Sequence, residues 1–324
     1  MKQKILYTLL LFCVVGLYAC KKNKQDVDIK QYDDQQIQNY ISSHGLTGMQ
    51  RDMTSGDTTG IYYQILSPGN PNKRVGYSDS VSLVFSIRSF DGKFVDNDTI
   101  GSGHVTNFLG HITQNQIPYG VELAIVNLLK YKGGRMRLLL PSHLAYGSAG
   151  YGTGSSSGNN RIAGNQCLDY YINLIDNQKT YDDQVIKSYI SANNLSGFIP
   201  AAVGNDTLDS NNKPQNYIYY KITKPGVGAP ITSTSSVSIQ YTVYLLNGMI
   251  TSDQYNAVDG SGVTVNIADS TLPGLAAGLT HTLPGSKISI LVPSKLAYGS
   301  GAFSDGTIPV NSCLRYEINV ISAQ

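Results

Sequence analysis

The chain repeats itself over a distance that suits a domain and is too long for a turn or a solenoid unit. The decapeptide PSHLAYGSAG begins at Pro141, and PSKLAYGSGA begins at Pro293. Likewise, YDDQQIQNYIS from Tyr32 returns as YDDQVIKSYIS from Tyr181. Solenoid repeats have periods of about 20–50 residues, whereas domains typically have about 100–150. We therefore interpret the sequence as a duplicated domain.

Two shorter matches fall in the same order between and after these. IYYQI at residues 61–65 returns as IYYKI at 218–222, and CLDY from Cys167 returns as CLRY from Cys313. Four ordered matches exclude chance. They divide the chain into a signal peptide (1–19), a lipidated tether (20–31), a first repeat (32–178) and a second repeat (179–324).

The N-terminus has the layout of a secretory signal. Lys2 and Lys4 precede an apolar run at residues 5–17, which is shorter than the ~20 residues needed to span a bilayer. The run ends in Leu-Tyr-Ala-Cys20, which resembles a bacterial lipoprotein processing box. We expect a lipid on Cys20 and an extracytoplasmic protein anchored to the cell envelope. The alternative is a soluble secreted protein.

Charge and composition exclude some partners. Without Lys2 and Lys4, the numbers of basic and acidic residues are equal. A neutral chain without charge runs has no electrostatic footprint for nucleic acid, so no nucleic-acid partner is expected. The 23 tyrosines, 33 glycines and absence of tryptophan fit a β-rich extracytoplasmic protein.

Side chains for covalent or metal chemistry are sparse. The five histidines show no ligand spacing, so we interpret them as surface residues and expect no metal or cofactor. The GxSxG match at residues 154–158 lies in a Gly/Ser-rich loop at 147–160, where a nucleophile elbow is not expected. Asp96-Asn97-Asp98 is interpreted as a turn, without the rest of a calcium-loop pattern. Cys167 and Cys313 occupy matching positions and are expected to be buried free thiols.

Periodicity predicts the same elements in each repeat. Apolar residues at helical spacing follow the acidic pairs Asp33-Asp34 and Asp182-Asp183, which we place at the start of a helix. Gly45 and Asn194 are expected to end these helices in the left-handed conformation. Alternating strands at 81–87 and 168–172 recur at 237–245 and 314–318, and the apolar run at 136–140 recurs at 288–292. A short helix is expected at 118–129 and at 273–283. The predicted class is α+β, with a curved antiparallel sheet around a short helix in each repeat and an amphipathic helix before it.

The order of these pieces resembles the FKBP-type peptidyl-prolyl isomerases. The family's AYG turn matches Leu-Ala-Tyr146-Gly and Leu-Ala-Tyr298-Gly, and its closing IPPN-x-x-L-x-F segment matches IPVN at 308–311 with Leu314 and Tyr316. The resemblance covers about residues 58–177 and 214–324. Copy one departs from it, because Ile162-Ala163-Gly164-Asn165 lacks the family's prolines.

The resemblance implies roles for particular residues. Catalytic roles fall to Tyr146, Asp96, Tyr298 and Tyr241. Copy one has Phe85 where copy two has Tyr241, copy two has Thr251-Ser252 in place of Asp96, and Val121 and Leu275 replace the family's pocket-floor Trp. Substrate-binding roles fall to Phe85, Val95, Val121, Ile162, Tyr170, Leu272, Leu275, Ile308 and Tyr316.

The function that the resemblance implies is isomerisation of X-Pro bonds in proline-containing polypeptides, without covalent chemistry. The incomplete residue sets predict weak turnover. A polypeptide-binding or chaperone lipoprotein without useful catalysis is the first alternative, and a structural surface lipoprotein is the second.

Overall fold

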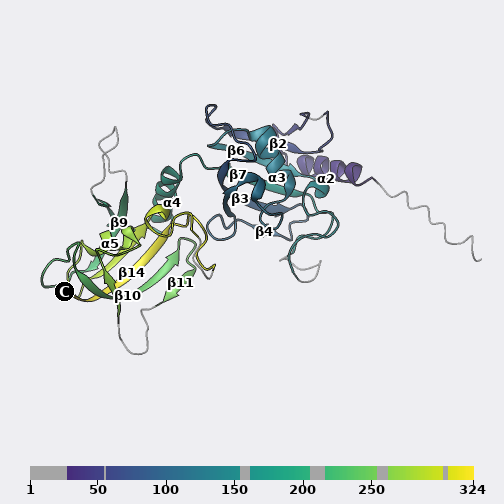
Figure 1. Cartoon of the computed structure of the whole chain (residues 1–324). Coiled ribbons are helices and arrows are strands. Elements are labelled where there is room, and N and C mark those ends of the chain that lie inside the picture. Colours follow the sequence, from purple (N-terminus) through teal and green to yellow (C-terminus); the bar gives the residue numbers. More distant parts are fainter. Residues whose placement is uncertain (1–27, 55, 154–160, 205–215, 254–261, 302–305) are drawn as a thin grey trace, which may run out of the picture.

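The computed structural model describes residues 28–54, 56–153, 161–204, 216–253, 262–301 and 306–324. These residues form two seven-stranded sheets in which the strands pair antiparallel. Figure 1 shows them as two lobes, the first in blue and teal and the second in green and yellow. None of the helices in the described segments has the length and apolar character needed to cross a membrane.

The two sheets have the same topology. The first has the order β1-β2-β6-β7-β3-β4, with β5 also on β3; the second has the order β8-β9-β13-β14-β10-β11, with β12 also on β10. The first comprises β1 (Gln50–Arg51), β2 (Tyr62–Pro68), β3 (Ser80–Ser89), β4 (Val95–Asp96), β5 (His104–Phe108), β6 (Gly134–Leu140) and β7 (Leu168–Leu174). The second comprises β8 (Ile199–Ala202), β9 (Tyr217–Lys224), β10 (Ser236–Leu245), β11 (Ile250–Asp253), β12 (Val263–Asn266), β13 (Lys287–Val292) and β14 (Leu314–Ala323).

The correspondence extends to strand register. Tyr170 of β7 lies opposite Leu138 of β6, and Tyr316 of β14 lies opposite Ile290 of β13. Because a shift of one residue would turn each side chain to the other face, matching registers place equivalent side chains on equivalent faces. Tyr170 and Tyr316 are both almost fully buried in the cores of their lobes.

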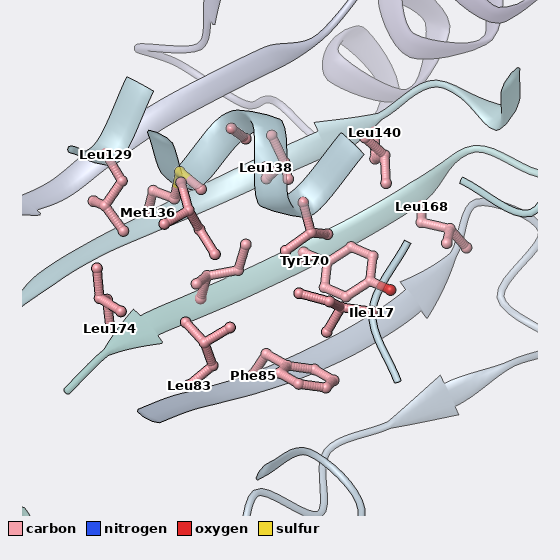
Figure 2. Packing of buried hydrophobic residues seen from close by; sticks show 14 of the residues in the cluster. Leu83, Phe85, Ile117, Leu129, Met136, Leu138, Leu140, Leu168, Tyr170 and Leu174 are labelled. Carbon is pink, nitrogen blue, oxygen red and sulfur yellow. The ribbon is translucent and has the colours of Figure 1, made fainter. Parts of the chain in front are cut away.

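A short helix covers the inner face of each sheet. In the first lobe α3 (Tyr119–Ala124) continues into a π-helical turn, η2 (Ile125–Leu129), and in the second α5 (Pro273–Leu279) ends four residues before the predicted limit. A Cβ at Gly278 would stand 2.2 Å from Ile290 Cδ1, so glycine allows α5 to lie close against β13. Figure 2 shows the first core, with Tyr170 among Phe85, Ile117 and Leu138.

The leading helices pack on the opposite face of each sheet. Ile37 and Tyr40 of α2 (Ile29–Ser43) join a cluster with Leu139, whereas its neighbours Leu138 and Leu140 face the main core. This alternation is what a strand covered on both faces requires. Helix α4 (Gln178–Ala192) contributes Ile186 to the equivalent cluster in the second lobe.

The helix ends agree with the sequence and the helix starts do not. Gly45 and Asn194 have φ of 59° and 51°, as expected for residues that end a helix in the left-handed region. The N-caps, however, are Asp28 and Asn177, whose side chains accept from Lys30 N and Thr180 N. Asp33-Asp34 and Asp182-Asp183 therefore lie beyond the first turn, and their placement at the helix start was wrong.

Removal of the Ile186 side chain tests the packing of α4. Ile186→Ala is expected to destabilise the second lobe by about 2–5 kcal/mol, because the side chain is fully buried and its loss leaves a cavity. Its neighbour Lys187 is exposed and pairs only with Asp183 on the same helix, so Lys187→Ala should cost less than about 0.5 kcal/mol. Urea unfolding followed by circular dichroism measures both, and equal midpoints for the two variants would contradict the assignment.

Candidate functional site

The turn that carries each Ala-Tyr-Gly tyrosine is held by one carbonyl. In the second lobe the 3-10 turn η4 (Ser294–Leu296) follows β13, and Ser294 O accepts from Ala297 N at 3.1 Å and Gly299 N at 2.8 Å. These two amides flank Tyr298. Gly299 has φ of 60°, a conformation in which glycine has no steric cost. In the first lobe η3 (Ser142–Leu144) repeats both bonds, from Ala145 N and Gly147 N to Ser142 O.

A buried aspartate of the leading helix binds each of these turns. The Asp182 side chain accepts from Ser294 N at 2.9 Å and from Ser294 Oγ at 2.6 Å. Asp33 accepts from Ser142 Oγ at 2.7 Å and from His143 N at 3.1 Å, and it contacts His143 Nδ1 at 2.8 Å. The aspartates that sequence reasoning assigned to helix capping instead connect the leading helices to the tyrosine turns.

The pKa values of the two aspartates are shifted in opposite directions. Burial raises the pKa of Asp33, but the hydrogen bonds from His143 and Ser142 outweigh it and hold the pKa below its usual value. Burial also raises the pKa of Asp182, and there the hydrogen bonds from Ser294 and Gln178 do not offset it. The extra contact with His143 in the first lobe accounts for part of this difference.

The second lobe contains a pocket of about 440 Å³ at this turn. Its wall includes strand β12, the segment at 269–272 and the first turn of α5. All six residues that the sequence assigned to the pocket of copy two line it: Tyr241, Leu272, Leu275, Tyr298, Ile308 and Tyr316. Residues up to 75 positions apart in the chain therefore meet in one concavity.

The pocket is apolar at its base and polar at its mouth. Leu275, Ile308 and Tyr316 are buried, whereas Tyr298 is partly exposed. Burial, followed by the neighbouring Tyr298 and Tyr241 phenols, raises the pKa of Tyr316. The Tyr316 hydroxyl has no hydrogen-bond partner of ordinary distance and angle among the residues described. Tyr298 is thus the phenol of this pair that a ligand can reach.

Several pocket residues escaped the sequence reasoning. Val263 and Val265 of β12 line the pocket, and so do Asp269 and Ser270 in the loop that follows. The alternation in VTVN at 263–266 marks a strand, but pairing of this strand with β10 is what brings it to the pocket. The Asp269 carboxylate is the acidic group of the pocket lining.

The matching positions of the first lobe are packed into its core. Phe85, Val121, Ile162 and Tyr170 are all at most 5% exposed. Phe85 and Tyr170 approach each other with ring centroids 6.0 Å apart, and Figure 2 shows both rings on the core side of the sheet. These side chains are about as buried as Leu275, Ile308 and Tyr316, which line the pocket of the second lobe, so their assignment to a substrate site in copy one stays a prediction.

Tyr146 is covered by a second aromatic ring. Its ring stacks on that of Tyr151 with centroids 4.6 Å apart, and burial raises the pKa of Tyr146 to about 12. Tyr151 is fixed by its hydroxyl, which donates to Asn115 O at 2.9 Å, and by backbone pairing with Ile162. The residue at the position of Tyr151 in copy two is Phe303, which lies outside the described residues.

Strand register also identifies the residue of the second lobe that lies at the position of Asp96. Asp96 lies opposite Ile87 of β3, and Ser252 lies opposite the equivalent Val243 of β10. The Asp96 carboxylate accepts from Asp98 N at 3.0 Å, whereas Ser252 lines the second pocket. Val95, assigned to substrate binding, is 42% exposed and lies outside the first core cluster.

Two histidines, His104 and His143, are partly buried, which corrects the interpretation of all five as surface residues. Burial lowers the pKa of His104 to about 4. His143 contacts Asp33. His281 is exposed, as expected, and its ring stacks on that of Tyr220 with centroids 4.5 Å apart. Cys167 and Cys313 are buried free thiols, as expected, and burial raises the pKa of both. Cys20 and the GxSxG match at 154–158 lie outside the described residues.

A comparison with protein families finds a match in the second lobe. Residues 228–321 match the family model described as FKBP-type peptidyl-prolyl cis-trans isomerase. This part of the chain is an FKBP-type domain. The FKBP-type domain contains all six predicted pocket residues of copy two, from Tyr241 to Tyr316.

Relatives of the chain carry the same description. The chain is 26% identical over 170 residues to the FKBP-type peptidyl-prolyl cis-trans isomerase FkpA of Buchnera aphidicola. This match covers 52% of the chain and 65% of the relative. The chain is 31% identical over 109 residues to the peptidyl-prolyl cis-trans isomerase Mip of Coxiella burnetii, covering 34% of this chain and 46% of the relative. The solved structure of FkpA from Escherichia coli matches with a TM-score of 0.34 and 19% identity, covering 45% of this chain and 61% of that one.

The two buried aspartates should respond to pH in opposite directions. The lowered pKa of Asp33 stabilises the fold above the unfolded-state pKa of about 4, and this contribution is lost as pH falls through the folded value. The cost of Asp33→Asn should therefore be larger at pH 7 than below pH 4. The raised pKa of Asp182 gives a contribution that is lost as pH rises, so the cost of Asp182→Asn should be smaller at pH 7 than below pH 4.

Urea midpoints of wild type and both variants across this pH range measure the two slopes. Slopes of the same sign would contradict the account of the two sites.

Proposed function

We propose that the chain is a peptidyl-prolyl cis-trans isomerase whose working site is the pocket of the FKBP-type domain. The observation that carries the proposal is the meeting of Tyr241, Tyr298 and Tyr316 with six aliphatic side chains in one pocket of about 440 Å³. Pockets for small ligands typically have about 300–1,000 Å³ and combine an apolar lining with a few polar groups. A proline ring and its flanking peptide bonds are of that size.

An apolar pocket is sufficient for this reaction. Rotation about a peptide bond must cross about 18–20 kcal/mol, because resonance resists twisting, and for X-Pro bonds both isomers are populated. The twisted amide has lost resonance, so its carbonyl is less dipolar than that of the planar form. Removing water therefore penalises the twisted amide less than the planar one, which lowers the barrier.

Each group in the pocket has a place in this scheme. Tyr298 is partly exposed, and its hydroxyl would donate to a substrate carbonyl, which fixes the peptide while the X-Pro bond turns. Leu275 and Ile308 offer the apolar base for the proline ring. No nucleophile and no metal enter the scheme, since no covalent bond is made or broken.

Two substitutions support slow turnover. Leu275 provides the base of the pocket in place of a flat indole. An aliphatic side chain holds the substrate ring less closely than an indole does. Thr251 and Ser252 line the wall where copy one has Asp96 in register. If catalysis is negligible, the same pocket remains suited to holding proline-containing polypeptides, as in a chaperone.

We further propose that the chain is a tandem protein in which both repeats derive from one FKBP-like ancestor and only the second catalyses. The shared strand order and register support the common origin. The packing of Tyr146 under Tyr151 supports the loss of the first site.

A matched pair of conservative substitutions tests the catalytic assignment. Tyr298→Phe should lower kcat/KM for a proline-containing tetrapeptide about tenfold, since one hydrogen bond worth about 1–1.5 kcal/mol is lost. Tyr146→Phe removes the same hydroxyl from the first lobe and should leave kcat/KM within about twofold. A protease-coupled isomerisation assay measures both. A larger loss in Tyr146→Phe than in Tyr298→Phe would overturn the assignment.

The proposed location depends on Cys20. Lys2, Lys4 and the apolar run precede a processing box, which supports a lipid-anchored protein of the cell envelope. Cys20→Ser should move the protein from the membrane to the soluble fraction and abolish incorporation of an alkyne-labelled fatty acid. Cys13→Ser, within the segment that would be removed, serves as the control. Labelling that survives Cys20→Ser would contradict lipidation at this residue.

A further inference from the structure

Polar side chains of the first lobe contact the second lobe near its pocket. Asn311, which ends the IPVN segment, donates from Nδ2 to Thr106 Oγ1 on β5 at 2.8 Å. Asn247, in the turn between β10 and β11, donates from Nδ2 to Asp98 Oδ2 at 2.7 Å. Ile100 packs beside these contacts against both hydrophobic clusters of the second lobe. The first lobe therefore contacts two of the segments that border the pocket.

From Thr106 a chain of hydrogen bonds continues through the first lobe to helix α4. Thr106 Oγ1 donates to Ser82 Oγ at 3.3 Å, and Ser82 Oγ donates to Gln178 Oε1 at 3.0 Å. Gln178, the first residue of α4, then donates from Nε2 to Asp182 Oδ1 at 2.7 Å. Thr106 and Ser82 lie opposite each other on β5 and β3, so sheet pairing fixes their separation.

This chain closes into a ring at the tyrosine turn. Asp182 binds Ser294 through its backbone amide and its hydroxyl, and Ser294 O accepts from Gly299 N. Gly299 O in turn accepts from Asn311 N at 2.7 Å, which returns to the residue where the chain began. Along the chain from Asn311 to Gln178, each side chain donates to the next one, and the last donor binds the Asp182 carboxylate. Aligned donors of this kind polarise and strengthen one another.

We propose that the first lobe positions the pocket of the second lobe, with Thr106, Ser82 and Gln178 as positioning residues. The ring connects the turn that carries Tyr298 with the segment that carries Ile308. It thereby fixes the separation of these two parts of the pocket wall. Two of its members, Ser82 and Thr106, belong to the first lobe, so the ring exists only when the lobes are docked. A repeat whose own tyrosine is packed under Tyr151 thereby retains a role in the site of its neighbour.

The consequence for catalysis rests on the proposed isomerase activity, but the positioning itself does not. Gly299 N and Asn311 N are both hydrogen-bonded backbone amides within the ring. Their hydrogen exchange reports how often the turn and the segment open, whatever the chain does to substrates. Exchange at these two amides therefore tests the positioning separately from the activity.

The experiment uses the full chain and two variants from different arms of the ring. Thr106→Val keeps the side-chain shape and removes the acceptor for Asn311, and Gln178→Met removes both bonds of the Gln178 amide. Each variant removes two hydrogen bonds of the ring and should speed exchange at Gly299 N and Asn311 N at least about fivefold, the factor expected for the loss of a single hydrogen bond. Each should lower kcat/KM for the proline tetrapeptide three- to tenfold, mainly through kcat. Thr113→Val, which removes an exposed hydroxyl that bonds only to Gln116, is the control and should change neither quantity.

The outcomes separate the two claims. Unchanged exchange at both amides in Thr106→Val and Gln178→Met would overturn the positioning role, even if wild type is an active isomerase. Faster exchange in both variants, together with a wild-type chain that does not isomerise the peptide, would support the positioning role and remove the proposed function. Thermal melting of each variant checks folding. If one variant fails to fold, the other still decides the question.

Discussion

The contact between a buried aspartate and the serine before Leu-Ala-Tyr-Gly is the constraint on which the rest of each lobe depends. Asp182 and Asp33 leave water entirely, and each is satisfied by donors from a turn more than a hundred residues away in the chain. A buried carboxylate without such donors would cost several kcal/mol. The contact therefore fixes the leading helix against the sheet and the tyrosine turn against the helix at once.

The same scaffold supports two different outcomes. In the second lobe the turn brings Tyr298 to a pocket that also contains Tyr241 and Ile308. In the first lobe it delivers Tyr146 into a stack with Tyr151, and the surrounding residues belong to the core. The sheets do not account for this difference, because strand order and register are shared. The two lobes thus share a framework but differ in the exposure of the tyrosine that follows Leu-Ala.

Much of this could be predicted from the sequence, for physical reasons that particular residues show. The alternation around Tyr241 and Tyr316 gave both strands and faces, and the repeat showed that the pattern recurs. The function of Asp33 and Asp182 could not be predicted, because acidic residues near a helix start have a local explanation that hides a partner about 110 residues away. The role of β12 was missed because its pairing with β10 is non-local. The stacking of Tyr146 on Tyr151 could not be predicted either, because sequence alone leaves Tyr151 in a loop.

The central claim is that only the second lobe presents its tyrosine to a ligand. It is tested most directly by titrating the full chain, with ring-labelled tyrosine, with an Ala-Pro tetrapeptide and following the assigned NMR signals. The account predicts that the signals of Tyr298 and Tyr241 shift with peptide concentration, whereas those of Tyr146 and Tyr170 stay in place. Shifts at Tyr146 with none at Tyr298 would contradict it.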